Sequence, residues 1–230
     1  MPDIIANTSD GEIEGPNVAS FSDARNGTTG TADNNDSTAT SVAVFKFTGR
    51  GGGSTFRCDR SFFLFDTSGV TGTVSEAILK IRFVGTRQGD ANAIVLKSDA
   101  FGGDGSAALA NDDFNNLDFS TPYSSEVDTS NISTYTEISL NATALADMKN
   151  NDQLILAIIN HDYDYSNSEP STASNSVALT FADQTGTSTD PRITYTLATG
   201  YSHDIMGLAS ANIGKVNTLA TANVGKISGT

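Results

Sequence analysis

The sequence predicts an all-β protein, namely a two-sheet antiparallel β-sandwich of the jelly-roll type with a short C-terminal repeat extension. Ser, Thr, Asn, Asp and Gly together make up half of the 230 residues. These residues favour turns over long helices, because the polar side chains compete for backbone hydrogen bonds and glycine loses the most backbone entropy. Hydrophobic residues, at 37%, still suffice for a packed interior. Short apolar or alternating segments recur between turn-rich stretches, which is typical of a sandwich, with a jelly roll favoured over an immunoglobulin-type sandwich.

The strands follow from alternation and from apolar runs. Glu76–Val84 alternates apolar and mostly polar residues and predicts one half-buried strand. Leu154–Ile159 is continuously apolar and predicts a central strand covered on both faces. In chain order, the other predicted strands are Asp3–Ala6, Val18–Phe21, Ser41–Phe47, Ser61–Phe65, Ala93–Lys97, Tyr135–Leu140, Val177–Phe181 and Ile193–Leu197.

Helix is scarce in the sequence. Asn141–Lys149 has an N-cap residue at its start and apolar residues three apart, Leu145 and Met148, which predicts about two helical turns. A second short turn is predicted within Ser106–Phe114. Nothing in the pattern indicates a cofactor-binding α/β sheet.

The chain divides into residues 1–200, a sandwich domain whose first ~40 residues are a strand and loop lead-in, and residues 201–230. In the second part, Gly207–Asn217 is followed directly by Thr218–Ser228, an 11-residue repeat with six identical positions. Two such units cannot bury their apolar residues alone, so the repeat is predicted to dock or to oligomerise, with a homotrimer favoured. The alternative is a solvated tail left by duplication. The candidate assembly residues are Leu208, Ile213, Val216, Leu219, Val224 and Ile227.

The charge excludes several classes of partner. The formal net charge is −14, and this surface repels phosphate backbones and anionic lipids, so we expect neither a nucleic-acid nor a membrane partner.

Cys58 is the single cysteine, which excludes an internal disulfide. The start, MPDIIANTSD, lacks the basic and apolar regions of a secretory signal. A virion protein, made in the host cytoplasm and later exposed, combines these traits; a non-classically exported protein or a fragment without its signal would also fit.

Catalysis is not expected. His161 and His203 are the only histidines, and no nucleophile-elbow, zinc-protease or phosphate-loop motif occurs. Cys58 with His161 as base is conceivable, but Cys58 lies beside a predicted strand and is better explained as a small buried hydrophobe. The absence of Trp argues against a glycosidase.

Two ligand hypotheses remain. Asp162 and Asp164 follow the buried strand and share one side of an extended chain, and Asp183 follows another strand at a similar edge. Such oxygen ligands suit Ca²⁺, although acidic loops are usually only solvated. Tyr163 and Tyr165, with Tyr123 and Tyr201, lie in loop-like segments where exposed rings can stack on host glycans; otherwise they fill gaps at strand ends.

Two segments resemble known families. Arg60–Thr86, with its FDTS turn, and the closing segment Phe181–Leu197 resemble a jelly-roll β-sandwich family of predicted tailed-bacteriophage structural proteins, similar to carbohydrate-binding modules. The repeat resembles the A-x-A-x-I-x-K-V-N-G-V units of phage appendage proteins, except that Thr218 replaces the glycine after Asn217.

The resemblance implies a non-enzymatic bacteriophage virion protein, either a capsid decoration or a fibre or tail appendage, that contacts other virion proteins. The alternatives are a carbohydrate-binding or adhesive module for host surface glycans and an extracellular polymer-forming bacterial protein.

Overall fold

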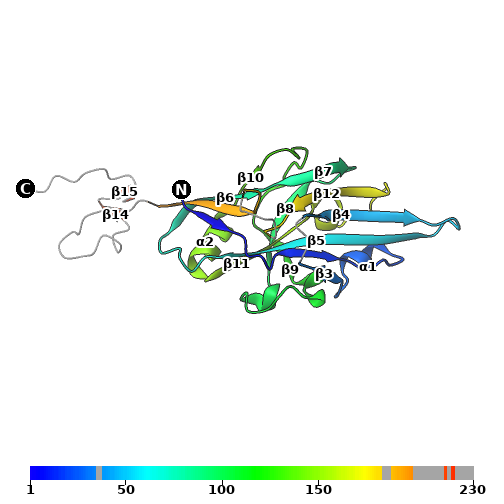
Figure 1. The fold of residues 1–230 in the computed structure, drawn as a ribbon, viewed down its shortest axis with the longest axis horizontal. Helices are drawn as coiled ribbons and strands as arrows, with labels where there is room; N and C mark the ends of the chain where they lie inside the picture. Colours follow the sequence, from blue (N-terminus) through cyan, green and yellow to red (C-terminus); the bar gives the residue numbers. More distant parts are fainter. Residues whose placement is uncertain (35–37, 183–187, 199–214, 217–218, 221–230) are drawn as a thin grey trace, which may run out of the picture.

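The protein is a β-sandwich, seen in a computed structural model that describes residues 1–34, 38–182, 188–198, 215–216 and 219–220 (Figure 1). Its strands are β1 Asp3–Ile5, β2 Gly11–Glu14, β3 Thr31–Asp33, β4 Thr38–Thr48, β5 Ser54–Asp66, β6 Val74–Ile81, β7 Phe83–Gln88, β8 Ala93–Ser98, β9 Leu117–Pro122, β10 Thr136–Ser139, β11 Gln153–Asn160, β12 Ser174–Thr180 and β13 Arg192–Leu197. The helical segments are α1 Phe21–Arg25, η1 Phe101–Gly103, η2 Asn111–Asn115, α2 Ala142–Asn150 and η3 His161–Tyr165. No helix in these described ranges is long and apolar enough to cross a bilayer.

The strand order is that of a jelly roll. One sheet has the order β1-β13-β6-β10, and the larger sheet contains the run β5-β11-β8-β9. In chain order these eight strands alternate between the sheets, except that β8 and β9 are neighbours in the larger sheet, which is the order of a jelly roll with two Greek keys. All the pairings are antiparallel. The predicted fold class is therefore confirmed.

Strand β5 organises the larger sheet. Its first half pairs with β4, from Ser54 to Asp59, and its second half with β11, from Ser61 to Asp66. Strand β2 pairs with Asp59 through Phe62 and so shares residues with both neighbours. Because each edge of a strand holds one partner at a time, β4 and β11 lie on one edge of β5 and β2 lies on the other. The sheet thus forks at β5, and β12 and β7 extend the β4 branch.

Strand β11 is buried on both faces, as predicted. Leu154, Leu156 and Ile158 contribute to the core between the two sheets. The alternate residues Ile155, Ala157 and Ile159 contribute to a second core on the outer face of the larger sheet. Phenylalanines from α1, η1 and η2 cover that second core: Phe21, Phe101 and Phe114.

Helix α2 confirms the prediction from its cap. The side chain of Asn141 accepts hydrogen bonds from the backbone N–H groups of Thr143 and Ala144, at 3.1 and 3.2 Å. Ala144 and Met148 are buried against the core between the sheets. The turn predicted within Ser106–Phe114 corresponds to the short 3₁₀ helix η2, which begins at Asn111.

Two strand predictions were wrong in detail. Val18–Phe21 is not a strand, because Ser20 caps helix α1 and Phe21 is its first residue; only Val18 makes an isolated β-bridge, to Phe56. Glu76–Val84 is not one strand either. The chain leaves the smaller sheet after Ile81 and enters the larger one at Phe83, so Arg82 is the point of crossing.

The repeat extension is described only where its two units meet. Lys215–Val216 (β14) pairs antiparallel with Leu219–Ala220 (β15), with Val216 opposite Leu219. This two-stranded pair belongs to neither sandwich sheet. The other candidate assembly residues, Leu208, Ile213, Val224 and Ile227, lie outside the described residues.

Candidate functional site

The turn that follows β11 carries the residues singled out for ligand binding. His161–Tyr165 forms a π-helical turn, η3, with Asn160 as its N-cap. The side-chain oxygen of Asn160 accepts the N–H of Tyr163 at 2.9 Å, while its amide nitrogen donates to the carbonyls of Asp90 and Asn175. Single π-helical turns are uncommon and occur frequently at functional sites.

This turn separates the two carboxylates that an extended chain would place together. Asp164 is fully buried and its two oxygens accept from Arg60, at 2.8 Å from Nε and 2.9 Å from Nη2. Asp162 is one-fifth exposed and lies beside His161 instead. The expectation that Asp162 and Asp164 face one side was therefore wrong, because the chain is helical there. The guanidinium of Arg60 already binds both oxygens of Asp164, so Asp162 and Asp164 do not form the predicted Ca²⁺ site together. Asp183, the third residue predicted for this site, lies outside the described residues.

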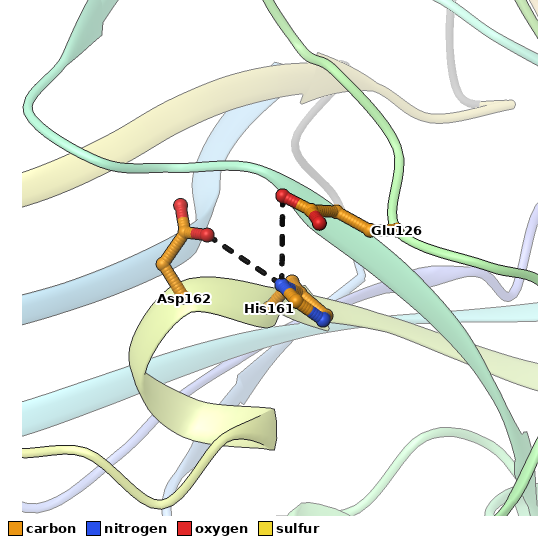
Figure 2. A group of neighbouring side chains, drawn as sticks. All are labelled: Glu126, His161 and Asp162. Carbon is orange, nitrogen blue, oxygen red and sulfur yellow. Dashed lines mark hydrogen bonds and ion pairs between the residues drawn. The ribbon is translucent and has the colours of Figure 1, made fainter.

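Asp162 instead belongs to a cluster with Glu126 and His161 (Figure 2). The Nδ1 atom of His161 is 3.5 Å from Oδ1 of Asp162 and 3.7 Å from Oε1 of Glu126. Glu126 comes from the loop between β9 and β10, which a β-bridge between Ala93 and Val127 holds against β8. The side chains of His161 and Glu126 are 25% and 48% exposed, so solvent reaches the cluster.

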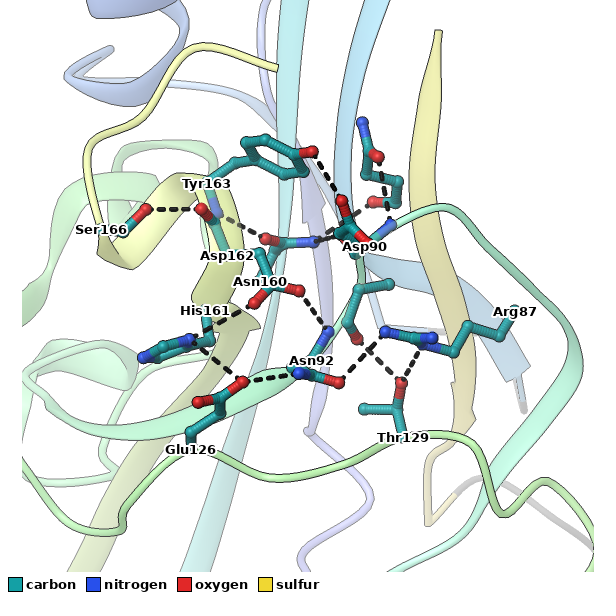
Figure 3. A network of polar contacts seen from close by, with 12 residues as sticks. Arg87, Asp90, Asn92, Glu126, Thr129, Asn160, His161, Asp162, Tyr163 and Ser166 are labelled. Carbon is teal, nitrogen blue, oxygen red and sulfur yellow. Dashed lines mark hydrogen bonds and ion pairs between the residues drawn. The ribbon is translucent and has the colours of Figure 1, made fainter. Parts of the chain in front are cut away.

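Asn92 connects the parts of this cluster (Figure 3). Its backbone N–H donates to Oδ2 of Asp162 at 2.9 Å, and its side-chain amide donates to Oε1 of Glu126 at 2.5 Å. Its own side-chain oxygen accepts from Arg87 at 3.1 Å, and its carbonyl accepts the N–H of His161 at 2.7 Å. Both carboxylates are thus held in place by groups outside the cluster.

The candidate glycan-binding tyrosines differ in exposure. Tyr163 is buried in the second core and donates its hydroxyl to Asp90 at 3.0 Å. Tyr123 is also buried, with its hydroxyl on Asp147 at 2.6 Å. Tyr165 is half-buried and stacks on the ring of His161, with centroids 5.6 Å apart. Tyr201 lies outside the described residues. The described tyrosines of this set form no exposed row.

Cys58 lies in the second core, fully buried. Burial raises the pKa of its thiol well above the ordinary value, and the negative charge of Asp164 adds to this effect. A catalytic cysteine needs an accessible thiolate, and this environment disfavours one. Within the described residues, no hydrogen bond or ion pair joins Cys58 to His161.

Two buried charges that the sequence reading missed lie on the same strand as Cys58. Arg60 pairs with Asp164, and Asp59 pairs with Arg57 through a contact of 3.0 Å. Burial raises the pKa of Asp59 to about 7, although the charge of Arg57 acts in the opposite direction. The available signal was that the polar residues Arg57, Asp59, Arg60 and Ser61 directly precede the apolar run Phe62–Phe65 of the same strand.

A polar pocket of about 590 Å³ lies apart from the cluster, between the end of β8 and the turn before β11. Lys97, Asp99, Asp104, Asp152 and Gln153 are among its lining residues. The carboxylates of Asp99 and Asp152 are exposed and make no side-chain hydrogen bond or ion pair with other described residues. One wall is the loop that begins with Phe101, whose ring is fully buried.

No family model matches the sequence, and a search of curated proteins finds no match.

Proposed function

We propose that this chain is a non-enzymatic structural protein of a bacteriophage virion, a capsid decoration or a fibre or tail appendage that assembles through its C-terminal repeat. The supporting observation is the jelly-roll sandwich joined to a repeat of another composition. Residues 1–200 carry 26 of the 27 acidic residues, whereas residues 201–230 carry one acidic residue and two lysines. An acidic sandwich stays soluble, and a near-neutral repeat with periodic apolar residues supplies a contact surface.

The buried charged side chains bind each other and the backbone, which agrees with a structural role for the sandwich. The guanidinium of Arg60 and the carboxylate of Asp164 bind each other, and Arg60 also donates to the carbonyls of Phe114 and Arg25, at 2.8 and 2.6 Å. These groups tie β5 to α1, η2 and η3, and they are not exposed to a substrate.

Light scattering on the purified chain tests the assembly element. We expect a closed oligomer, a trimer in the favoured case, that dissociates when Leu208→Asp and Leu219→Asp are combined. The matched control combines Ser210→Asp and Thr221→Asp, which add the same charges at polar positions of the two units. A monomeric wild type, or equal behaviour of both double variants, contradicts the proposal. Growth into open filaments instead favours the polymer-forming alternative, because only a heterologous contact that does not close propagates.

Location in the virion is tested separately. Mass spectrometry of purified virions from a phage that encodes the chain should detect it in a fixed copy number relative to the major capsid protein. Its absence from the particles contradicts the proposal even when the chain oligomerises.

Glycan binding is a second candidate, and the polar pocket favours it. Carboxylates without a partner, such as Asp99 and Asp152, can accept hydrogen bonds from sugar hydroxyls. A glycan array should then show binding that Asp152→Asn weakens, while Asp128→Asn, at an exposed carboxylate outside the pocket, leaves it unchanged. An array without signal above background removes this candidate.

A further inference from the structure

The cluster of Glu126, His161 and Asp162 has the donor set of a divalent transition-metal site. It offers one imidazole nitrogen and two carboxylate oxygens, and these three atoms lie within 4.8 Å of one another. Imidazole nitrogen favours Zn²⁺ and its neighbours in the transition series, whereas Ca²⁺ takes oxygen ligands. The set therefore differs in chemistry from the Ca²⁺ set predicted from the sequence.

The two separations that involve His161 are close to those of a zinc site. With bonds of about 2.0–2.1 Å, two ligand atoms of a tetrahedral zinc site lie about 3.3–3.4 Å apart. Nδ1 of His161 is 3.5 Å from Asp162 and 3.7 Å from Glu126, a few tenths of an ångström more. A direct charge-assisted hydrogen bond would be shorter, about 2.7–2.9 Å. Figure 2 shows Nδ1 directed at both carboxylates, with the other ring nitrogen pointing away from them.

Surrounding groups hold each ligand. Asn92 donates to Oδ2 of Asp162 through its backbone, which leaves Oδ1 directed at His161, and to Glu126 through its side chain. Arg87 fixes the orientation of the Asn92 amide (Figure 3). Tyr165 stacks on the imidazole with an interplanar angle of 25°. Metal ligands are typically oriented by such hydrogen-bonded neighbours.

We propose that Glu126, His161 and Asp162 bind one Zn²⁺-class divalent ion through Oε1, Nδ1 and Oδ1, with a fourth position open to solvent. The exposure of Glu126 and His161 leaves room for water or for a ligand from a neighbouring protein at that position. The ion joins the loop between β9 and β10 to the turn after β11, two segments that are otherwise linked here through Asn92. This site would be a structural clamp, independent of the repeat.

Isothermal titration calorimetry of the full chain, freed of metal with a chelator, tests the proposal with ZnCl₂ as the probe. We expect one Zn²⁺ per chain in the wild type and no binding in His161→Ala. The matched control is His203→Ala, which removes the only other histidine and should retain the wild-type Kd. Asn92→Ala keeps the backbone donor to Asp162 but loses the side-chain contact to Glu126, so we expect its Kd to rise by about 10-fold or more.

Thermal unfolding gives a second readout. At free Zn²⁺ about 100-fold above Kd, the folded-to-unfolded ratio should rise by about 100-fold in the wild type and in His203→Ala, but not in His161→Ala. Circular dichroism in chelator checks that His161→Ala is folded; if it is not, Glu126→Gln replaces it, because that side chain is half-exposed. Equal Zn²⁺ binding by His161→Ala and the wild type, no binding by the wild type, or tighter binding of Ca²⁺ than of Zn²⁺ would overturn the proposal.

Discussion

Arg60 and Asp164 form a bidentate ion pair with both side chains fully buried, and the residues are 104 positions apart in the sequence. Burial alone would lower the pKa of Arg60, but the charge and the hydrogen bonds of Asp164 outweigh it and raise that pKa. The centroid of the Phe114 ring lies 4.2 Å from the guanidinium carbon, so the ring covers the guanidinium group. The pair joins β5 to η3, the turn that also orients His161.

Removal of one partner should be strongly destabilising. Asp164→Asn leaves the buried charge of Arg60 without compensation, so we expect the free energy of unfolding to fall by about 3–5 kcal/mol. Equilibrium urea denaturation measures this value. Glu169→Gln breaks the exposed pair with Lys46 and should cost less than about 1 kcal/mol. The double variant Arg60→Met with Asp164→Leu should recover part of the loss; a loss in Asp164→Asn no larger than in Glu169→Gln contradicts this account.

Asp59 makes stability depend on pH in a defined direction. Its folded pKa of about 7 lies above the ordinary value of 3.8, so the folded state binds more protons between these values. This contribution to stability is complete below the ordinary pKa and is lost as pH rises through 7. We therefore expect Asp59→Asn to gain stability relative to the wild type between about pH 5 and about pH 7, by up to about 1.4 kcal/mol per pH unit.

Urea denaturation across this range gives the comparison. Asp66→Asn serves as a control, because hydrogen bonds from Ser68 lower the pKa of Asp66 in the folded state, and the ordinary pKa of 3.8 keeps it ionised in the unfolded state over the same range. If the difference in free energy of unfolding between Asp59→Asn and the wild type stays constant with pH, Asp59 does not titrate in this pH range.

Gly89 is needed at the start of the turn that carries Asp90 and Asn92. Its φ is +56°, and an added Cβ would lie 2.4 Å from Oδ1 of Asn175 and 2.6 Å from the carbonyl of Ser174. Gly89→Ala should cost more than about 1 kcal/mol, seen as a lowered Tm. Gly53→Ala is the control, since a Cβ there meets no atom within 4 Å. Equal Tm values for the two variants would show that the turn relaxes.

Cys58 should be unreactive in the folded protein. Its pKa is raised and its side chain is fully buried, so the thiolate that attacks a disulfide reagent is scarce and shielded. Labelling with a chromogenic disulfide reagent at neutral pH should be slow in buffer and complete within minutes in denaturant. Fast labelling of the native chain would indicate that the second core opens readily.

Alternation and composition sufficed to predict the sandwich, because each half-buried strand has an apolar residue at every second position, on the face that packs against the core. Helix α2 followed from the cap at Asn141. The crossing at Arg82 was not predictable, since the alternation of Glu76–Val84 continues through it and only the packing of two sheets breaks the strand.

The candidate site was predicted only in part, because its residues come together through the packing of distant segments. Asp162 was singled out from its place after a buried strand, but its partners come from elsewhere in the chain. Glu126 precedes it by 36 positions and Asn92 by 70, and no local pattern marks either residue. The π-helical turn then rotates Asp164 away; Asn160 caps this turn through the N–H of Tyr163, and the carbonyls of Asp90 and Asn175 hold the Asn160 side chain.

Strand β13 lies between β1 and β6 in the smaller sheet, with Ile193 opposite Ile4 on one side and Leu79 on the other. A nascent chain therefore lacks the centre of this sheet until residues 192–197 have left the ribosome. Contacts so distant in sequence form late, because the loop that separates them must close first. We expect one face of the larger sheet to stay uncovered during synthesis, so that chaperones contact the phenylalanines of β5 before β13 does.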